Sequence, residues 1–375
     1  MIKNSTVFVL GAGSSWHYGY PTGEELVAHV IQSADRLAAY CERRLSDQVL
    51  QGVIPEYVAQ RIDPSGGTNA AVNGWRLVQA ECRLLIRRLR AVRPLLIDHF
   101  LAWNENLRPI GKLMIAAAIL ECEAAKDYRK EWYRYIVHKL AYGCSKSADL
   151  FQNDVHFITF NYDASLEYRL SEALTSLDIM KQGDVEKFLT EDRIVHPYGC
   201  VHRGIPTEED FIDASVASQM GHPFSTPLNF SSDFQPRKLF LDRCLSAAQN
   251  LRTIDPHDKD KDKASLTQAR KWIKEASVIY ILGYGFDANN NQRIGLETIV
   301  RDSAKIVMFT NFGDMNTINK KASKLFLGRH DHFSGLTPLG EPTGRYFEKS
   351  VRDVYDALEK DFDPLEEELT GTTKI

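Results

Sequence analysis

Three polar side chains in this sequence have functional groups that can hold a water molecule and take its proton. Asn161 and Asp163 directly follow the apolar run Val155–Phe160, and His196 follows a shorter apolar run. A side-chain amide both donates and accepts hydrogen bonds, which suits it to positioning water. A neutral imidazole can accept a proton from that water, and Asp163 could orient the imidazole. His202 is a rival for the histidine role, and the structural alternative makes Asn161 a helix cap and Asp163 a first-turn charge.

A second candidate group follows the first apolar run of the chain, Thr6–Leu10. Gly11 and Gly13 let the backbone turn tightly and approach a phosphate closely, and amides at the start of the next helix would face a pyrophosphate. The pattern departs from G-x-G-x-x-G, because Trp16 occupies the third glycine position. A plain dehydrogenase is therefore disfavoured, and a strand-turn-helix corner without a ligand is the alternative.

The elements that must position these residues alternate between strands and helices. Apolar runs typical of buried strands end in Gly, Asn or Asp, and they occur at 6–10, 155–160, 277–282 and 304–309. This alternation predicts an α/β fold, a Rossmann-like parallel sheet whose polar strand ends share one edge. As a strand-end residue, Asn161 is expected to be exposed at that edge.

The stretch from residue 37 to 149 has helical periodicity instead. Apolar residues recur there at steps of three and four, as in Trp75, Val78, Cys82, Leu85 and Leu89. We predict a discontinuous Rossmann domain at 1–36 and 150–350, a large helical insertion at 37–149, and a C-terminal helix and polar tail at 351–375. The insertion exceeds what covering one sheet face requires, so we expect it to support a homo-oligomer.

Five segments, in this order along the chain, resemble motifs of the SIR2 (sirtuin-like) family. They are Gly11-Ala12-Gly13-Ser14-Ser15 with Gly19 and Pro21, of the form G-A-G-x-S-x-x-x-G-x-P; Asn161-Tyr162-Asp163, similar to T-x-N-x-D; His196-Pro197-Tyr198-Gly199, similar to an H-x-Y-G strand end; Gly283-Tyr284-Gly285-Phe286-Asp287, similar to the late glycine turn; and Phe309-Thr310-Asn311, similar to the segment at the adenosine ribose. Together they cover most of the chain outside the helical insertion.

The resemblance implies a SIR2-like NAD glycohydrolase, which converts NAD and water to nicotinamide and ADP-ribose without a metal. It implies catalytic roles for Asn161, His196 and Asp163, where Asp163 would orient the histidine or bind a ribose hydroxyl. Tyr198 stands where sirtuins place the catalytic histidine, so His196 would act from two residues upstream, on the same side of an extended segment. The resemblance also implies the following NAD-binding residues: Gly11, Ala12, Gly13, Ser14, Ser15, Gly19, Pro21, Gly283, Gly285, Asp287 and Asn311.

Two other functions stay open at this point. An NAD-dependent protein deacylase is disfavoured, because sirtuins of that kind usually have a four-cysteine zinc module and none of the six cysteines here forms a C-x-x-C pair. A non-catalytic module that binds NAD or ADP-ribose as a signal is the second alternative. Binding without turnover would distinguish it.

Composition limits the setting and the partners. The net charge of -4 gives no general case for direct nucleic-acid or membrane binding, and no apolar run approaches the roughly 20 residues that span a bilayer. The first residues lack the apolar core of a signal peptide, so we expect a cytoplasmic protein. The resemblance implies the NAD-depleting effector of a bacterial anti-phage system. Its trigger would lie in a partner such as a HerA-type ATPase or an Argonaute-like protein.

Overall fold

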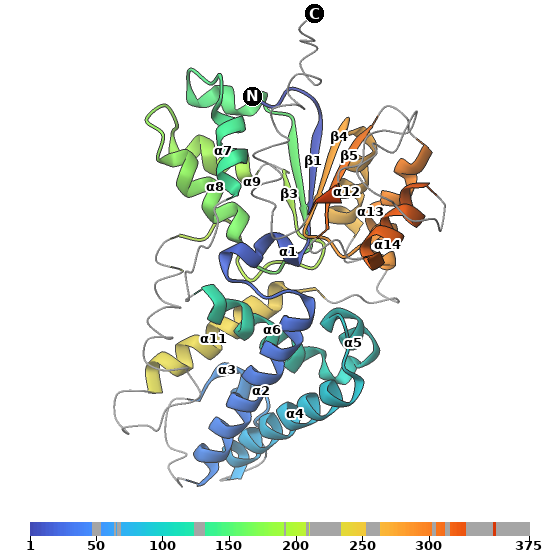
Figure 1. Ribbon diagram of the computed structural model, residues 1–375. Coiled ribbons are helices and arrows are strands. Elements are labelled where there is room, and N and C mark those ends of the chain that lie inside the picture. Colours follow the sequence, from blue (N-terminus) through green and yellow to red (C-terminus); the bar gives the residue numbers. More distant parts are fainter. Residues whose placement is uncertain are drawn as a thin grey trace, which may run out of the picture. The chain divides into compact units, whose positions relative to one another are not determined.

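The computed structural model describes residues 1–46, 54–63, 65, 69–123, 132–190, 193–207, 210, 234–252, 263–301, 305–311, 316–327 and 348–349. The chain divides into two compact units (Figure 1). The sheet unit comprises residues 1–18, 127–197 and 258–375, and the helical unit comprises residues 19–126 and 198–257. The helix and tail predicted at 351–375 lie outside the described residues.

The sheet unit is built on a six-stranded, wholly parallel sheet. Its strands are β1 (Thr6–Leu10), β2 (Val155–Thr159), β3 (Ile194–Val195), β4 (Val278–Leu282), β5 (Ile306–Thr310) and β6 (Glu348–Lys349). Their order in the sheet is β3-β2-β1-β4-β5-β6, which is the order of doubly wound dinucleotide-binding folds. The prediction of an α/β fold with a Rossmann-like parallel sheet is confirmed.

The apolar sequence of β1 explains its central place. Every residue of the strand is buried, because neighbouring strands and helices cover both of its faces. Phe8 pairs in register with Phe157 on β2 and with Tyr280 on β4. The rings of Phe157 and Tyr280 both stack on that of Phe8, with centroid distances of 5.2 and 4.8 Å. This aromatic stack connects the adjacent strands β2, β1 and β4 on one face of the sheet.

Helices flank the strands of the sheet unit. They are α1 (Ala12–Ser15), α7 (Tyr133–Ala141), α8 (Ser165–Thr175), α9 (Gln182–Thr190), α12 (Lys263–Glu275), α13 (Ala288–Ile294) and α14 (Asn316–Leu327), with short 3-10 turns at Trp16–Tyr18, Ser147–Gln152 and Leu296–Arg301. In Figure 1, α7, α8 and α9 lie to one side of the strands, and α13 and α14 lie to the other.

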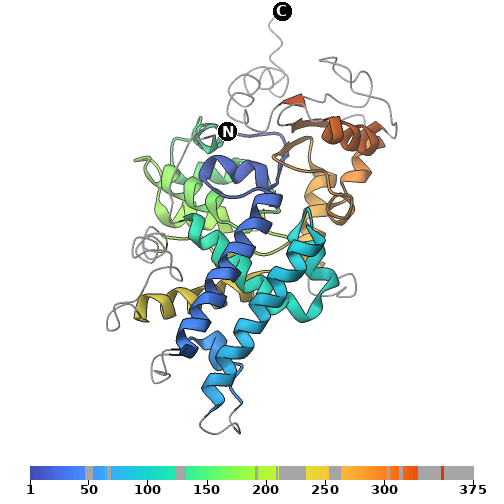
Figure 2. The ribbon, with the colours of Figure 1, turned by 60° about the horizontal axis from the view of Figure 1, so that its bottom comes forward.

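The helical unit contains α2 (Gly23–Ser46), α3 (Glu56–Ala59), α4 (Ala70–Val92), α5 (Ile97–Trp103), α6 (Arg108–Glu123) and α11 (Phe234–Asn250), with a 3-10 turn at Glu105–Leu107. The two longest helices, α2 and α4, pack side by side (Figure 2). The periodic apolar residues of α4 form its buried face, as their spacing predicts. No helix among the described residues is both long and apolar enough to cross a membrane.

The boundaries of the two units differ from the predicted ones. The α7 helix, which we assigned to the insertion, packs on α8 and belongs to the sheet unit. Residues 19–36 and 198–257, which we assigned to the Rossmann domain, belong to the helical unit instead. There α2 packs on α4 and α6, and α11 packs on α6. Helical periodicity shows that a segment has an apolar face, but not which partner covers that face.

Candidate active site

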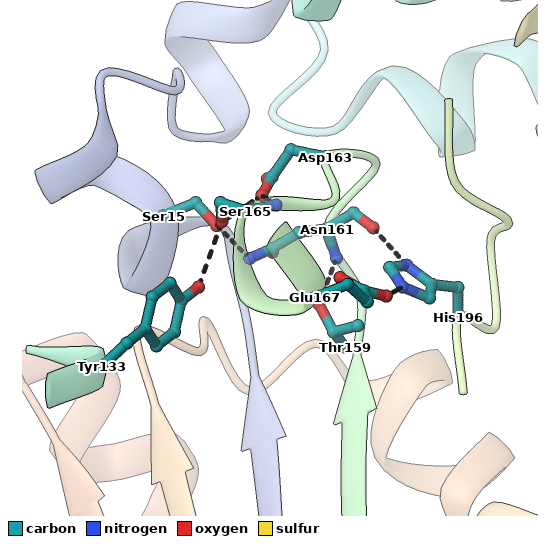
Figure 3. Close-up of polar contacts among 8 residues, drawn as sticks. All are labelled: Ser15, Tyr133, Thr159, Asn161, Asp163, Ser165, Glu167 and His196. Atoms are coloured by element: carbon teal, nitrogen blue, oxygen red, sulfur yellow. Dashed lines mark hydrogen bonds and ion pairs between the residues drawn. The ribbon is translucent and has the colours of Figure 1, made fainter. Parts of the chain in front are cut away.

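The candidate site lies at the carboxyl edge of the sheet, where β1 and β2 end beside each other. Leu10 pairs in register with Thr159, and the N–H of Phe160 donates to the carbonyl of Leu10 at 2.9 Å. Because the strands are parallel, the residues that follow them leave the same edge. Ser15, which follows β1, and Asn161, which follows β2, meet there (Figure 3).

Two buried serine hydroxyls hold the Asn161 amide in one orientation. The Nδ2 atom lies 3.1 Å from the Oγ of Ser14 and 2.7 Å from that of Ser15. The Ser14 hydroxyl donates its proton to the carbonyl of Gly11, and the Ser15 hydroxyl donates to Oδ1 of Asp163. Both hydroxyls can therefore only accept from Asn161, so the amide nitrogen must face them. The Oδ1 atom of Asn161 points elsewhere, and it is buried with no hydrogen-bond partner among the described residues.

Burial of Asn161 differs from the expectation for a strand-end residue. Only 7% of the residue is exposed. The reason is tertiary, because the turn after β1 folds over the end of β2 and brings the two serines against the amide. Its side chain is therefore part of a buried polar network.

Asp163 is the charged centre of that network. Its Oδ1 accepts from the hydroxyl of Ser165 at 2.5 Å and from the Ser165 N–H at 3.1 Å, in addition to the Ser15 hydroxyl. The hydroxyl of Tyr133 lies 3.1 Å from the Oγ of Ser165, so it donates to that oxygen. Burial raises the pKa of Asp163, and the hydrogen bonds from Ser165 and Ser15 offset only part of this rise.

His196 lies between the main chain of Asn161 and the carboxylate of Glu167 on α8. Its Nδ1 is 3.0 Å from the Asn161 carbonyl oxygen, and its Nε2 is 2.6 Å from Oε1 of Glu167. A carbonyl only accepts, so Nδ1 has its proton. Burial lowers the pKa of His196, but the charge and hydrogen bond of Glu167, the Asn161 carbonyl and the charge of Asp163 together outweigh burial and raise that pKa. Both ring nitrogens are engaged, so accepting a proton from water would require one of these bonds to break.

The glycine turns after β1 and β4 pack against each other, backbone to backbone. A Cβ on Gly11 would lie 2.5 Å from the carbonyl oxygen of Gly283, and a Cβ on Gly283, whose φ is +60°, would lie 2.1 Å from the nitrogen of Ser14. The amides of Gly13 and Ser14 donate to the carbonyls of Gly283 and Gly11, so these two do not face a pyrophosphate as the sequence suggested. Close backbone packing explains Gly11 and Gly283.

The remaining predicted residues of the sheet unit lie beyond β4 and β5. Asp287 caps α13, where its carboxylate accepts from two main-chain N–H groups at 3.0 and 3.1 Å. The Asn311 Nδ2 donates to Oδ1 of Asn319 at 2.6 Å, and both residues are buried. A Cβ on Gly285 would meet no atom of the described residues within 4 Å. Asp287 and Asn311 thus have structural contacts of their own at this edge.

Gly19, Pro21 and His202 belong to the helical unit. Gly19 has a φ of +86°, which favours glycine there. The Nε2 of His202 lies 3.0 Å from each carboxylate oxygen of Glu123, whose side chain is fully buried. This contact gives His202 a structural role within its own unit.

Two residues of the network received no role from the sequence. Glu167 lies four positions after Asp163, at the start of the helix that follows β2, so its nearness to the strand end was a usable signal. Tyr133 had no such signal, because it precedes Asn161 by more than a helix and a strand. In the described part of the chain, no three His, Cys, Asp or Glu side chains are grouped to hold a metal ion.

Comparison with known proteins adds no assignment. No family model, no curated protein and no solved structure matches the chain.

Proposed function

We propose that this chain hydrolyses NAD to nicotinamide and ADP-ribose at the site around Asn161. The observation that supports this most directly is the fixed amide of Asn161, whose nitrogen is held by two serines while its buried Oδ1 has no described donor. The strand order supports it as well, because the order reverses between β1 and β4, where doubly wound folds bind dinucleotides.

The reaction needs little from the protein beyond positioning. Nicotinamide leaves a cationic pyridinium as a neutral molecule, so its departure requires no general acid. The site must hold the ribose, stabilise an oxocarbenium-like centre and place a water molecule. The Oδ1 of Asn161 can accept a hydrogen bond from a ribose hydroxyl or from that water, and its fixed direction contributes to orientation. The proton that the water loses must pass to a nearby acceptor.

We further propose that the access of NAD to this site is controlled. Because Oδ1 of Asn161 is buried, NAD reaches it only after surrounding side chains move. Such a closed state suits the cytoplasmic, NAD-depleting effector of a bacterial anti-phage system. The purified protein would have a basal turnover that such motion allows. A partner that senses infection, such as a HerA-type ATPase or an Argonaute-like protein, would raise it. We further propose a homo-oligomer formed through the helical unit, without direct nucleic-acid or membrane binding.

The test is to incubate the purified protein with NAD and to follow free nicotinamide by chromatography. Release of nicotinamide without any acyl acceptor supports the proposal. Turnover only in the presence of an acetyl-lysine peptide would indicate a deacylase. Tight NAD or ADP-ribose binding without turnover would indicate a signalling module. A parallel assay with NADP determines the nucleotide preference.

A further inference from the structure

The carboxylate of Glu167 has one oxygen in use and one without a partner. Its Oε1 contacts Nε2 of His196 at 2.6 Å. Its Oε2 is buried and receives no hydrogen bond from the described residues. Only 10% of the Glu167 side chain is exposed. An acceptor buried without a donor is costly, so this position of Oε2 requires an explanation.

Glu167 and Asn161 are joined through a single imidazole. His196 contacts the main-chain carbonyl of Asn161 through one nitrogen and Glu167 through the other (Figure 3). The two residues that flank this ring each have a buried acceptor atom with no described partner, Oδ1 of Asn161 and Oε2 of Glu167. Each of these two acceptors could receive a hydrogen bond from a ligand that brings donors, such as a water molecule or a ribose hydroxyl.

The imidazole itself is not a free acceptor. Nδ1 has its proton because its partner is a carbonyl, and Nε2 shares a proton with Glu167, whichever of the two holds it. A proton from water can therefore enter this pair at Oε2 of Glu167 without breaking either bond of His196.

We propose that Glu167 accepts the proton of the attacking water through Oε2, and that His196 is a positioning residue that holds Glu167 against the main chain of Asn161. This inference depends on the proposed NAD hydrolysis. The water oxygen bonds to C1′ of the ribose, and the bond from C1′ to the nicotinamide nitrogen breaks. The electron pair of that bond stays on the nitrogen and makes nicotinamide neutral. The water proton passes to Oε2 and then to solvent, which leaves nicotinamide, ADP-ribose and one proton.

A carboxylate suits this step. An oxocarbenium-like centre is strongly electrophilic, so a weak base is sufficient for the attack of water. When the shared proton is on His196, the Glu167 carboxylate is ionised. Its negative charge then also stabilises the positive charge that develops on the sugar, as in glycoside hydrolysis.

The decisive variant is Glu167→Gln. Glutamine keeps an oxygen that can accept the Nε2 proton of His196, so the position of the imidazole is preserved, but the amide cannot take a proton. We expect kcat to fall by at least about 10²-fold while KM stays within about threefold. Glu172→Gln is the matched control, because Glu172 lies on the same helix with an exposed side chain, and it should turn over normally.

Chemical rescue separates a base from a positioning group. Glu167→Ala should regain turnover as formate is added, because formate can occupy the empty space and accept the proton. Near-normal kcat in Glu167→Gln would overturn the assignment, as would rescue of His196→Ala by imidazole without rescue of Glu167→Ala by formate. Circular dichroism on each variant confirms that it is folded. If the wild-type protein releases no nicotinamide, the proposed function itself is wrong. If the wild-type protein releases nicotinamide and Glu167→Gln does so at a similar rate, only the role of Glu167 is wrong.

Discussion

The role of Asn161 gives the sharpest prediction, because the chain contains a matched control. Asn161→Ala removes the two hydrogen bonds from Nδ2 to serine hydroxyls at 3.1 and 2.7 Å. Each such bond contributes about 1 kcal/mol, so the free energy of unfolding should fall by about 2 kcal/mol. The same change removes the positioned Oδ1 and should lower NAD turnover by at least about 10²-fold.

Asn153 is the control. It is also buried in the sheet unit, at 1% exposed, and its Nδ2 donates to the carbonyls of Leu140 and Leu150 at 3.1 and 2.9 Å. Its Oδ1 also accepts from the N–H of Ile2 at 2.7 Å. Asn153→Ala should therefore cost about 3 kcal/mol, slightly more than Asn161→Ala. Turnover per folded molecule should nevertheless stay within about twofold, because none of these contacts reaches the site.

The two variants are compared by urea unfolding and by nicotinamide release at a temperature where both are folded. A folded Asn161→Ala protein with nearly normal turnover would refute the role of Asn161 in NAD hydrolysis. An equal loss of turnover in Asn153→Ala would also refute it, because the effect would then be one of stability alone.

Four further outcomes follow from the structure. Gly283→Ala should lower the free energy of unfolding by at least about 1 kcal/mol, because Gly283 has a positive φ and a Cβ there would clash with the backbone. Gly285→Ala should change the free energy of unfolding little in the same urea assay, because no described atom lies near its Cβ position. NAD cleavage by the wild-type protein should persist in excess chelator, and loss of activity restored by zinc would contradict the metal-free chemistry. The raised pKa of His196 between Glu167 and Asp163 means that its protonated form stabilises the fold, so this contribution is complete below the ordinary pKa of 6.5 and is lost as the pH rises through the higher folded-state value. Urea midpoints should accordingly decline as the pH rises above 6.5, and less so in His196→Asn. His202→Ala should lower stability, because it leaves a buried carboxylate unpaired, yet it should keep most of the NAD turnover; an inactive but folded variant would reverse our ranking of the two histidines.

The sequence by itself was sufficient for the sheet and its polar edge. Four of the five residues of Thr6–Leu10 are apolar, and such a run can form a strand buried on both faces but no amphipathic surface element. Alternation of such runs with helical segments requires parallel strands, and parallel strands bring their ends to one edge. The sequence alone therefore assigns Asn161 and His196 to one edge, and the structure has them in contact.

Only the tertiary structure determined what each side chain does at that edge. The orientation of the Asn161 amide depends on two serines that lie nearly 150 positions away in the chain, and local sequence patterns contain no information on such a pairing. The role of Tyr133 and the boundaries of the two units depend in the same way on which helix packs on which. The glycines after β1 and β4 looked like a phosphate loop, because the same residue permits close approach to a phosphate or to another backbone. The partner that is present is the turn of Gly283, and long-range packing alone selects it.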